Sequence, residues 1–251
     1  MADSLFSLIA RIHGQQDWGS VLDAGTGDHS LQWITSLSTT DWTAITGSPS
    51  RAQGLSKRFE EVMRPNDAVL CGNWQDPMLL QGTKFDTVIC DYLIGAIAGF
   101  APYFQTEFFH RIQPHVGKRI YVVGLEPYPQ SADTPGGQHI LEIARLRDAC
   151  ILLAGHRCYR EYPMNWCIKE LERAGFIVDA AEHMGIRYGP RFINGQLDVC
   201  MRKLPHFNNR ALAEQMSKAI AELRQRALAL KETSRGIQFG QDYVIAARTK
   251  D

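Results

Sequence analysis

The chain has 251 residues, enough for one large α/β domain with insertions or for two small domains with sizeable cores. Its composition is that of an ordinary globular protein, with 45% hydrophobic and 22% charged residues. The 27 Lys and Arg residues balance the 27 Asp and Glu residues, so the formal net charge is zero. We therefore expect no nucleic-acid partner, because such a protein normally needs a basic face.

The first residues of the chain argue against export. Asp3 precedes a short apolar stretch, which reverses the charge order of a secretory signal. No segment reaches the roughly 18 uninterrupted apolar residues that a membrane span needs, so we expect a cytoplasmic protein without a membrane partner. The six cysteines form no C-x-x-C pair, which favours reduced thiols over a metal site.

The segment 21–30, VLDAGTGDHS, is the most informative of the chain. A short apolar run ends on Asp23 and is followed by Gly25 and Gly27. A buried strand that leads through a Gly-rich turn into a helix is typical of a site for a nucleotide-like ligand, because glycine lets the backbone approach closely. A dinucleotide enzyme needs a third glycine where Ser30 stands. Asp23 also favours a cationic ligand, since it would repel a diphosphate.

Apolar runs of strand length recur along the chain, and most are continuous rather than alternating. This pattern predicts strands covered on both faces, as in a parallel sheet. Helical patterns lie between the runs, and the alternation predicts a doubly wound α/β fold with ligands at the carboxyl ends of the strands. The predicted strands are 20–24, 42–46, 68–71, 87–91, 119–124, 176–181 and 243–247.

Two segments, at about 127–165 and 183–240, are longer than simple crossovers require. No linker or repeat sets them apart, so we expect a single domain, 1–251, with helical insertions on the substrate side. One amphipathic helix in the second insertion could pack on its own domain or on a second copy of the chain in a homodimer. The predicted helices are 50–63, 103–112, 139–154, 163–174, 192–204 and 209–231, besides one that starts near Asp28.

The pattern hydrophobic-hydrophobic-Asp-Ala-Gly-Thr-Gly closely resembles the first motif of class I S-adenosylmethionine-dependent methyltransferases. The resemblance spans most of the chain, as far as YVIAARTK at 243–250. It implies a doubly wound, seven-stranded, mostly parallel sheet whose last strand is antiparallel, with helical insertions after strands 5 and 6. It also implies S-adenosylmethionine as cofactor and S-adenosylhomocysteine as product, with Asp23, Gly25 and Gly27 around the methionine part.

The family's second signature, an acid that ends the second strand and holds the ribose hydroxyls, is missing. The strand is followed here by Gly47 and Ser48. Ser48 is the ribose contact we expect, with Thr46 or Asp28 as alternatives. The missing carboxylate lowers the expected affinity, because a charge-assisted hydrogen bond is worth roughly 1.5–3 kcal/mol.

Two further segments resemble family motifs. Gly72, Asn73 and Trp74 look like the adenine-binding turn, in which Asn73 meets the base edge and Trp74 covers the ring, unless Trp74 only covers the core. FDTVICDYLIG at 85–95 matches the fourth motif, which implies that Asp91 and Tyr92 line the cofactor and the reaction centre.

Methyl transfer is an in-line displacement, so the enzyme mainly aligns the reactants, and a base matters only where the acceptor carries a proton. The candidate catalytic residues are Tyr92, Glu126 and His156, although Glu126 could instead form an ion pair that orders a loop. Tyr162 and Trp166, with Tyr159, either cage a cationic acceptor or pack helices.

The sequence therefore predicts a methyltransferase that acts on an oxygen or nitrogen of a small molecule. A non-catalytic methyltransferase-like binding subunit is the alternative, motivated by the missing ribose acid. A nicotinamide-dependent oxidoreductase is the third reading, and the missing third glycine counts against it.

Overall fold

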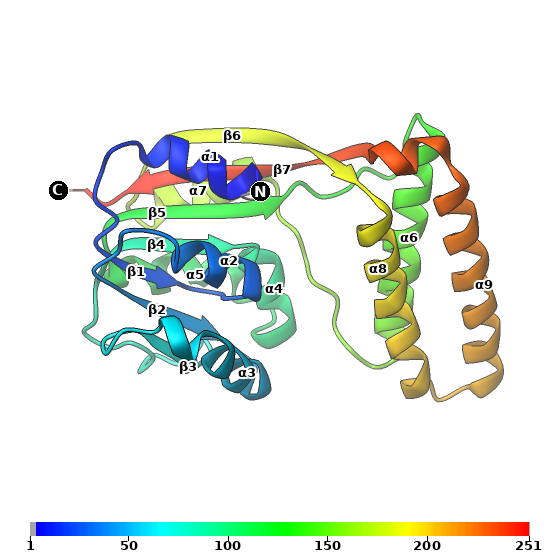
Figure 1. Ribbon diagram of the computed structural model, residues 1–251, viewed down its shortest axis with the longest axis horizontal. Helices are drawn as coiled ribbons and strands as arrows, with labels where there is room; N and C mark the ends of the chain where they lie inside the picture. The colour runs from blue at the N-terminus through cyan, green and yellow to red at the C-terminus, as the bar shows by residue number, and fades with distance from the viewer. Residues whose placement is uncertain (1–3, 251) are drawn as a thin grey trace. The chain divides into compact units, whose positions relative to one another are not determined.

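The computed structural model describes residues 4–250, so Asp3, used above for its charge, lies outside the described part. A seven-stranded sheet has the order β3-β2-β1-β4-β5-β7-β6 (Figure 1). The pairs among β1 to β5 are parallel, and β7 is antiparallel to β5. This confirms the predicted sheet. The strands are β1 (Ser20–Asp23), β2 (Asp41–Thr46), β3 (Ala68–Cys71), β4 (Phe85–Asp91), β5 (Val116–Leu125), β6 (Ile177–Tyr188) and β7 (Ile237–Arg248).

Every helix predicted from the sequence has a counterpart, whereas α1 and α4 were not predicted. The helices are α1 (Ser4–His13), α2 (Asp28–Ile34), α3 (Pro49–Phe59), α4 (Leu93–Phe100), α5 (Gln105–Ile112), α6 (Pro135–Leu153), α7 (Met164–Arg173), α8 (Pro190–Lys203) and α9 (Arg210–Ala229). Among residues 4–250, no helix is both long enough and apolar enough to cross a lipid bilayer.

The chain divides into two compact units. Unit 1 comprises residues 4–126, 160–184 and 242–250, and unit 2 comprises residues 127–159 and 185–241. The two insertions expected from the sequence therefore come together as one compact body, and β6 and β7 contribute residues to both units. The single-domain organisation stays a prediction, and each unit is described by itself.

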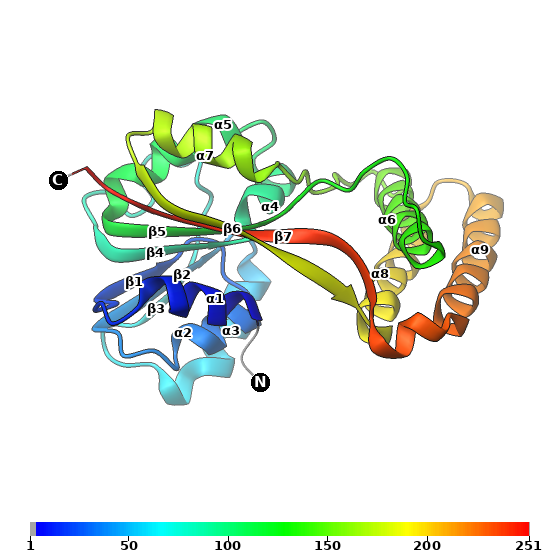
Figure 2. The same ribbon diagram turned by 90° about the horizontal axis from the view of Figure 1, so that it is seen from above.

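In unit 1, helices cover both faces of the sheet (Figure 2). The first three helices, α1, α2 and α3, pack on one face, while α4, α5 and α7 pack on the other. Central strands β1, β4 and β5 are buried on both sides, as their continuous apolar runs predict. The same prediction is wrong for β3, because it is an edge strand on which Leu70 is 36% exposed and Cys71 is exposed.

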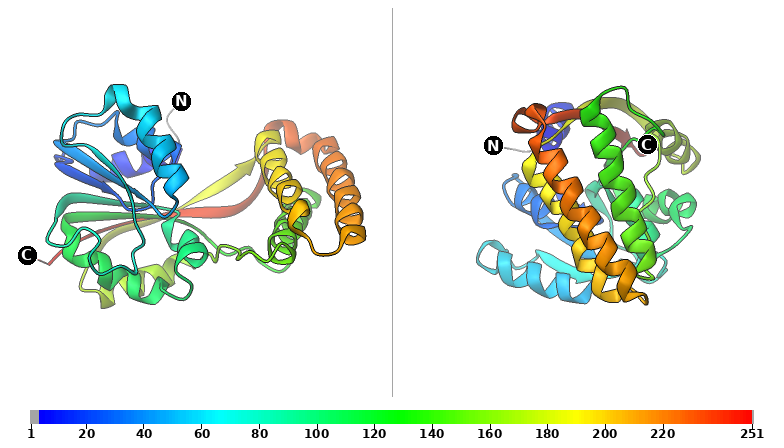
Figure 3. Two further views of the ribbon diagram at one scale, coloured as in Figure 1. Left: turned by 90° about the horizontal axis from the view of Figure 1, so that it is seen from below. Right: turned by 90° about the vertical axis from the view of Figure 1, so that its right-hand side faces the viewer.

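In unit 2, helices α6, α8 and α9 lie side by side (Figure 3). They share a core of their own, in which Ile140, Leu197, Ile220 and Leu223 are at most 1% exposed. Helix α9 thus buries its apolar stripe within its own unit, which is one of the two packings that the sequence allowed.

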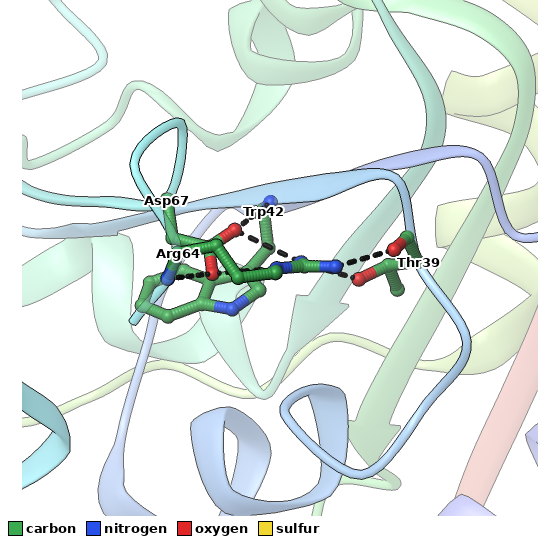
Figure 4. Close-up of polar contacts among 4 residues, drawn as sticks. All are labelled: Thr39, Trp42, Arg64 and Asp67. Atoms are coloured by element: carbon green, nitrogen blue, oxygen red, sulfur yellow. Dashed lines mark hydrogen bonds and ion pairs between the residues drawn. The ribbon is translucent and has the colours of Figure 1, made fainter. Parts of the chain in front are cut away.

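A polar network fixes the amino ends of β2 and β3 (Figure 4). The fully buried carboxylate of Asp67 accepts from the backbone N–H of Trp42 at 2.9 Å and from Arg64 Nε and Nη2, each at 2.9 Å. Arg64 also donates to Thr39 Oγ1 at 2.8 Å. Burial by itself would raise the pKa of Asp67, but the hydrogen bonds from Arg64 and the backbone outweigh it and hold that pKa below its ordinary value.

Candidate functional site

The turn after β1 is tied to both neighbouring strands. The N–H of Ala24 donates to Ile89 O of β4 at 2.8 Å, and the N–H of Thr26 donates to Ile45 O of β2 at 2.7 Å. A Cβ at Gly25 would lie 2.7 Å from the Leu93 side chain, whereas a Cβ at Gly27 would meet nothing within 4 Å. The turn is therefore closed by packing beside Gly25 and open beside Gly27.

Asp23 is the buried acid of this turn, and it is 1% exposed. Ser30 Oγ donates to its Oδ2 at 2.7 Å and accepts from the N–H of Gly27 at 3.0 Å. The other oxygen, Oδ1, has no hydrogen-bond partner among the described residues. Burial raises the pKa of Asp23 to about 6, and the hydrogen bond from Ser30 lowers it only in part. A buried carboxylate with one unpaired oxygen is costly unless a cationic donor completes it.

The candidates for the ribose contact after β2 are engaged in local structure. Ser48 is the N-cap of α3, where its hydroxyl accepts from the N–H of Arg51 at 3.4 Å. Asp28 forms an ion pair with Arg58 at 2.6 Å, and Thr46 is only 7% exposed. Of the described residues, the two that directly follow β2, Gly47 and Ser48, carry no carboxylate.

After β3, the side chains of Asn73 and Trp74 each donate a hydrogen bond to a backbone carbonyl of another segment. Asn73 Nδ2 donates to Phe100 O at 3.0 Å, which leaves one amide N–H for another acceptor. Trp74 Nε1 donates to Ala24 O at 2.7 Å, and its ring packs edge-on against Phe108. Because Trp74 is only 4% exposed, the structure favours its role as a cover of the core over its role as a cover of the adenine.

Asp91 and Tyr92 lie at the carboxyl end of β4, as predicted. Tyr92 is the N-cap of α4 and has a left-handed backbone, with φ 47° and ψ 21°. Its N–H donates to Val123 O of β5 at 3.0 Å, which holds this conformation in place. A non-glycine residue in this region costs about 1–2 kcal/mol, and such strain clusters at functional sites.

Glu126 follows β5 and connects α7 with β6. Its Oε1 accepts from the N–H of Met164, the first residue of α7, at 3.0 Å, and lies 2.9 Å from His183 Nε2. A carboxylate at a helix N-terminus is favourable, because it satisfies an unpaired N–H and opposes the positive end of the helix dipole. The geometry thus favours the loop-ordering role of Glu126 over that of a base.

His156, the third predicted catalytic residue, is exposed in unit 2. Its Nδ1 lies 2.9 Å from Lys203 Nζ, and its ring packs edge-on against His206. These contacts join the turn after α6 to the end of α8, so they favour a structural role for His156. In unit 1, the rings of Tyr162 and Trp166 lie tilted against each other with centroids 4.1 Å apart and pack against the core, which favours their helix-packing role.

Two residues of the site were missed from the sequence. Ser30 was read only as a missing glycine, although its spacing from Gly27 is that of a capping box and could have revealed its hydrogen bonds. Phe100, which packs on Gly47, carries no local signal because the two residues are far apart in the sequence.

No family model matches the chain, and no curated protein matches it. Its fold is similar to a candidate methyltransferase from Bacillus halodurans, 15% identical with a TM-score of 0.63 over 99% of each chain. A [4+2]-cyclase, SpnF, is 16% identical with a TM-score of 0.56 over 98% of this chain and 79% of its own. An S-adenosylmethionine-dependent methyltransferase from Geobacter sulfurreducens, bound to S-adenosylhomocysteine, is 12% identical with a TM-score of 0.52 over 98% and 90%. The chain therefore has the class I methyltransferase fold.

Proposed function

We propose that the protein is an S-adenosylmethionine-dependent methyltransferase that methylates an oxygen or nitrogen of a small molecule. One observation carries the proposal: the buried, unpaired Oδ1 of Asp23 beside the open space at Gly27. A ligand with an ammonium group can complete this carboxylate, and the cofactor has such a group. The similar structures with this fold support the same assignment.

The residues present fit this cofactor. Asp23 would accept from its ammonium, while Gly27 leaves room for the tail. The remaining amide N–H of Asn73 and the segment after β2 would face the nucleoside half. Asp91 and Tyr92, at the neighbouring strand end, would line the reaction side.

The cofactor supplies an electrophilic methyl group, so the chain mainly has to align the acceptor and exclude water. An acceptor with a proton also needs a base. Tyr92 is the candidate that lies beside the proposed cofactor turn, whereas Glu126 is assigned to holding α7. The small-molecule acceptor is the only partner that the proposal requires.

Isothermal titration with S-adenosylhomocysteine tests the proposal. The wild-type protein is expected to bind, and Asp23→Ala is expected to bind about tenfold or more weakly while its circular dichroism spectrum stays unchanged. Glu61→Gln, which removes an exposed carboxylate, is the matched control and is expected to bind normally. A folded wild-type protein that binds none would refute the proposal, and an unaffected Asp23→Ala variant would mean that the site lies elsewhere.

A second candidate function is cofactor binding without methyl transfer. The missing acid after β2 favours it, and the similar cyclase bears a name for a different reaction. The two candidates differ in turnover: a methyltransferase forms S-adenosylhomocysteine with some member of a panel of amines, alcohols and phenols. Binding without turnover across that panel, together with a stable partner protein, would favour the second candidate.

A further inference from the structure

Phe100, the last residue of α4, lies at the carboxyl end of β2. A Cβ at Gly47 would be 2.6 Å from Cδ1 and 3.0 Å from Cε1 of its ring, so the ring sits directly on the backbone of Gly47. The residue Phe100 is nevertheless 46% exposed, whereas Leu93, Ile94 and Ile97 of the same helix are buried. Phe100 is therefore only partly buried against the core.

The position of Phe100 is fixed by its backbone. Helix α4 ends there, because the backbone of the next residue, Ala101, is not helical (φ −145°, ψ 74°), although its N–H still donates to Ile97 O at 2.7 Å. Asn73 Nδ2 then holds the carbonyl of Phe100 at 3.0 Å. The segments after β2 and β3 and the end of α4 therefore meet at one place.

The contact also explains the missing acid. Any side chain at position 47 would overlap the ring of Phe100, so a carboxylate there and this ring exclude each other. What stands at the end of β2 is a flat apolar surface instead of a hydrogen-bond acceptor.

The turn after β1 leaves space for a ligand on one of its two glycines. Leu93 fills the space beside Gly25, on the side of α4, whereas the space beside Gly27 is open. Strands β1 and β2 are parallel neighbours about 5 Å apart, with Asp23 opposite Ala44, and β2 ends two residues further along, at Thr46. The part of the ligand that extends over β2 meets the exposed ring of Phe100.

We propose that Phe100 is the stacking platform for the nucleoside half of the cofactor and replaces the carboxylate that would hold the ribose hydroxyls. The inference rests on the proposed function, since it takes an adenosyl compound as the ligand. In this arrangement the adenine is recognised by stacking on the face of the Phe100 ring, which makes no hydrogen bond to the ribose hydroxyls.

Isothermal titration of wild type and variants with S-adenosylhomocysteine and adenosine tests the platform. Phe100→Ala is expected to weaken binding of both by about tenfold or more, as loss of base stacking does. Phe100→Tyr keeps the ring face and is expected to bind like wild type. Tyr103→Ala is the matched control, because it removes an aromatic side chain from a residue of the same segment that is 86% exposed.

The sugar provides a second readout. Wild type is expected to bind adenosine and 2′-deoxyadenosine within about threefold of each other, because no carboxylate holds the ribose hydroxyls. The double variant Gly47→Asp, Phe100→Ala exchanges the ring for an acid with room for its side chain. It is expected to prefer adenosine over 2′-deoxyadenosine by about tenfold or more.

The outcomes separate the two proposals. If wild type fails to bind S-adenosylhomocysteine, the proposed function falls and this inference with it. If wild type binds but a folded Phe100→Ala variant binds equally well, only the platform is overturned. Thermal unfolding of each variant establishes that it is folded, and Phe100→Tyr serves as the ring-retaining reference.

Discussion

Asp23 and Asp67 are both buried carboxylates of unit 1, but their surroundings differ. Asp67 lies among the donors of Arg64 and Trp42, and its pKa lies below the ordinary value. Asp23 accepts from Ser30 on Oδ2, its Oδ1 has no hydrogen-bond partner within residues 4–250, and its pKa is raised. The first acid serves the fold, whereas the second costs stability in the absence of a ligand.

We expect the stability of the ligand-free protein to fall as the pH rises from about 4 to about 6. Asp23 ionises in this range in the unfolded chain, whereas its raised pKa in the folded state means that folding disfavours the charged form. A shift from 3.8 to about 6 corresponds to about 3 kcal/mol. Urea unfolding of wild type and Asp23→Asn across this range measures the effect. The variant should lose most of the dependence, while Glu61→Gln should keep it; equal slopes in all three proteins would contradict the assignment.

Removal of the Asp67 carboxylate should destabilise the folded protein at pH 7, in contrast to removal of the Asp23 carboxylate. Asp67→Ala leaves the N–H of Trp42 without its acceptor and Arg64 without its partner, so we expect a loss of about 2–4 kcal/mol at pH 7. Because the pKa is lowered, this contribution is present above pH about 4 and is lost as the pH falls further. Denaturant titration measures it. Arg58→Ala, which breaks the exposed pair with Asp28, is the control and should cost about 0–1 kcal/mol.

At the scale of elements, the strands were easier to predict than α4. Strands β1, β4 and β5 are short apolar runs that end in turn residues, and this pattern is local. The segment LIGAIAGF is apolar all round and contains two glycines, so it has no helical stripe; it forms α4 because it packs against the sheet. The same distinction holds for the residues of the site. The motif around Asp23 is local in the sequence and could be predicted, whereas the contact between Phe100 and Gly47 is long-range and could not.

Two glycines should respond to alanine with opposite signs. Gly124 pairs with Tyr243 across β5 and β7, and a Cβ there would lie 2.2 Å from the hydroxyl oxygen. That hydroxyl is held by Tyr162 O, so we expect Gly124→Ala to destabilise the protein by about 1–3 kcal/mol. Gly54 is exposed inside α3 with nothing within 4 Å, and Gly54→Ala should stabilise by about 0.5–1 kcal/mol. Thermal unfolding measures the stability of both variants. A Gly124→Ala variant as stable as wild type would contradict the prediction.

The cap on α7 separates structure from catalysis at Glu126. Glu126→Ala removes the acceptor of the Met164 N–H and should lower stability by about 1 kcal/mol, whereas Glu126→Gln retains an acceptor oxygen and should cost less. If the carboxylate only orders the loop, Glu126→Gln should also retain most of the turnover. A large fall in turnover with unchanged stability would instead make Glu126 the base. Unfolding curves and initial rates of both variants provide the comparison.

At the scale of the whole molecule, the chain forms two compact units with separate cores. It passes between them four times, at 126/127, 159/160, 184/185 and 241/242. Neither insertion looked like a domain in the sequence, because each supplies only part of the core shared by α6, α8 and α9. A body built from two separate stretches has no boundary in composition, which is why the sequence suggested one domain.

Ligand binding should stabilise the units unequally. S-adenosylhomocysteine at about 100 times its Kd should raise the free energy of unfolding of the unit that binds it by about 2.7 kcal/mol. The proposed site lies in unit 1, so hydrogen exchange should slow in β1 and β4 and change little in α9. Mass spectrometry with and without the ligand measures this. Protection confined to α6, α8 and α9 would contradict the placement of the site.

The fourfold passage of the chain has a practical consequence for engineering. Residues 127–159 and 185–241 each leave and re-enter unit 1, and the turn at Asp23 belongs to neither stretch. A chimaera could therefore exchange both stretches together for those of another protein with this fold, while every residue proposed to grip the methyl donor stays in place. Such recombinants would test the expectation that the two stretches lie on the substrate side, since the acceptor accepted should then change while the affinity for the donor stays.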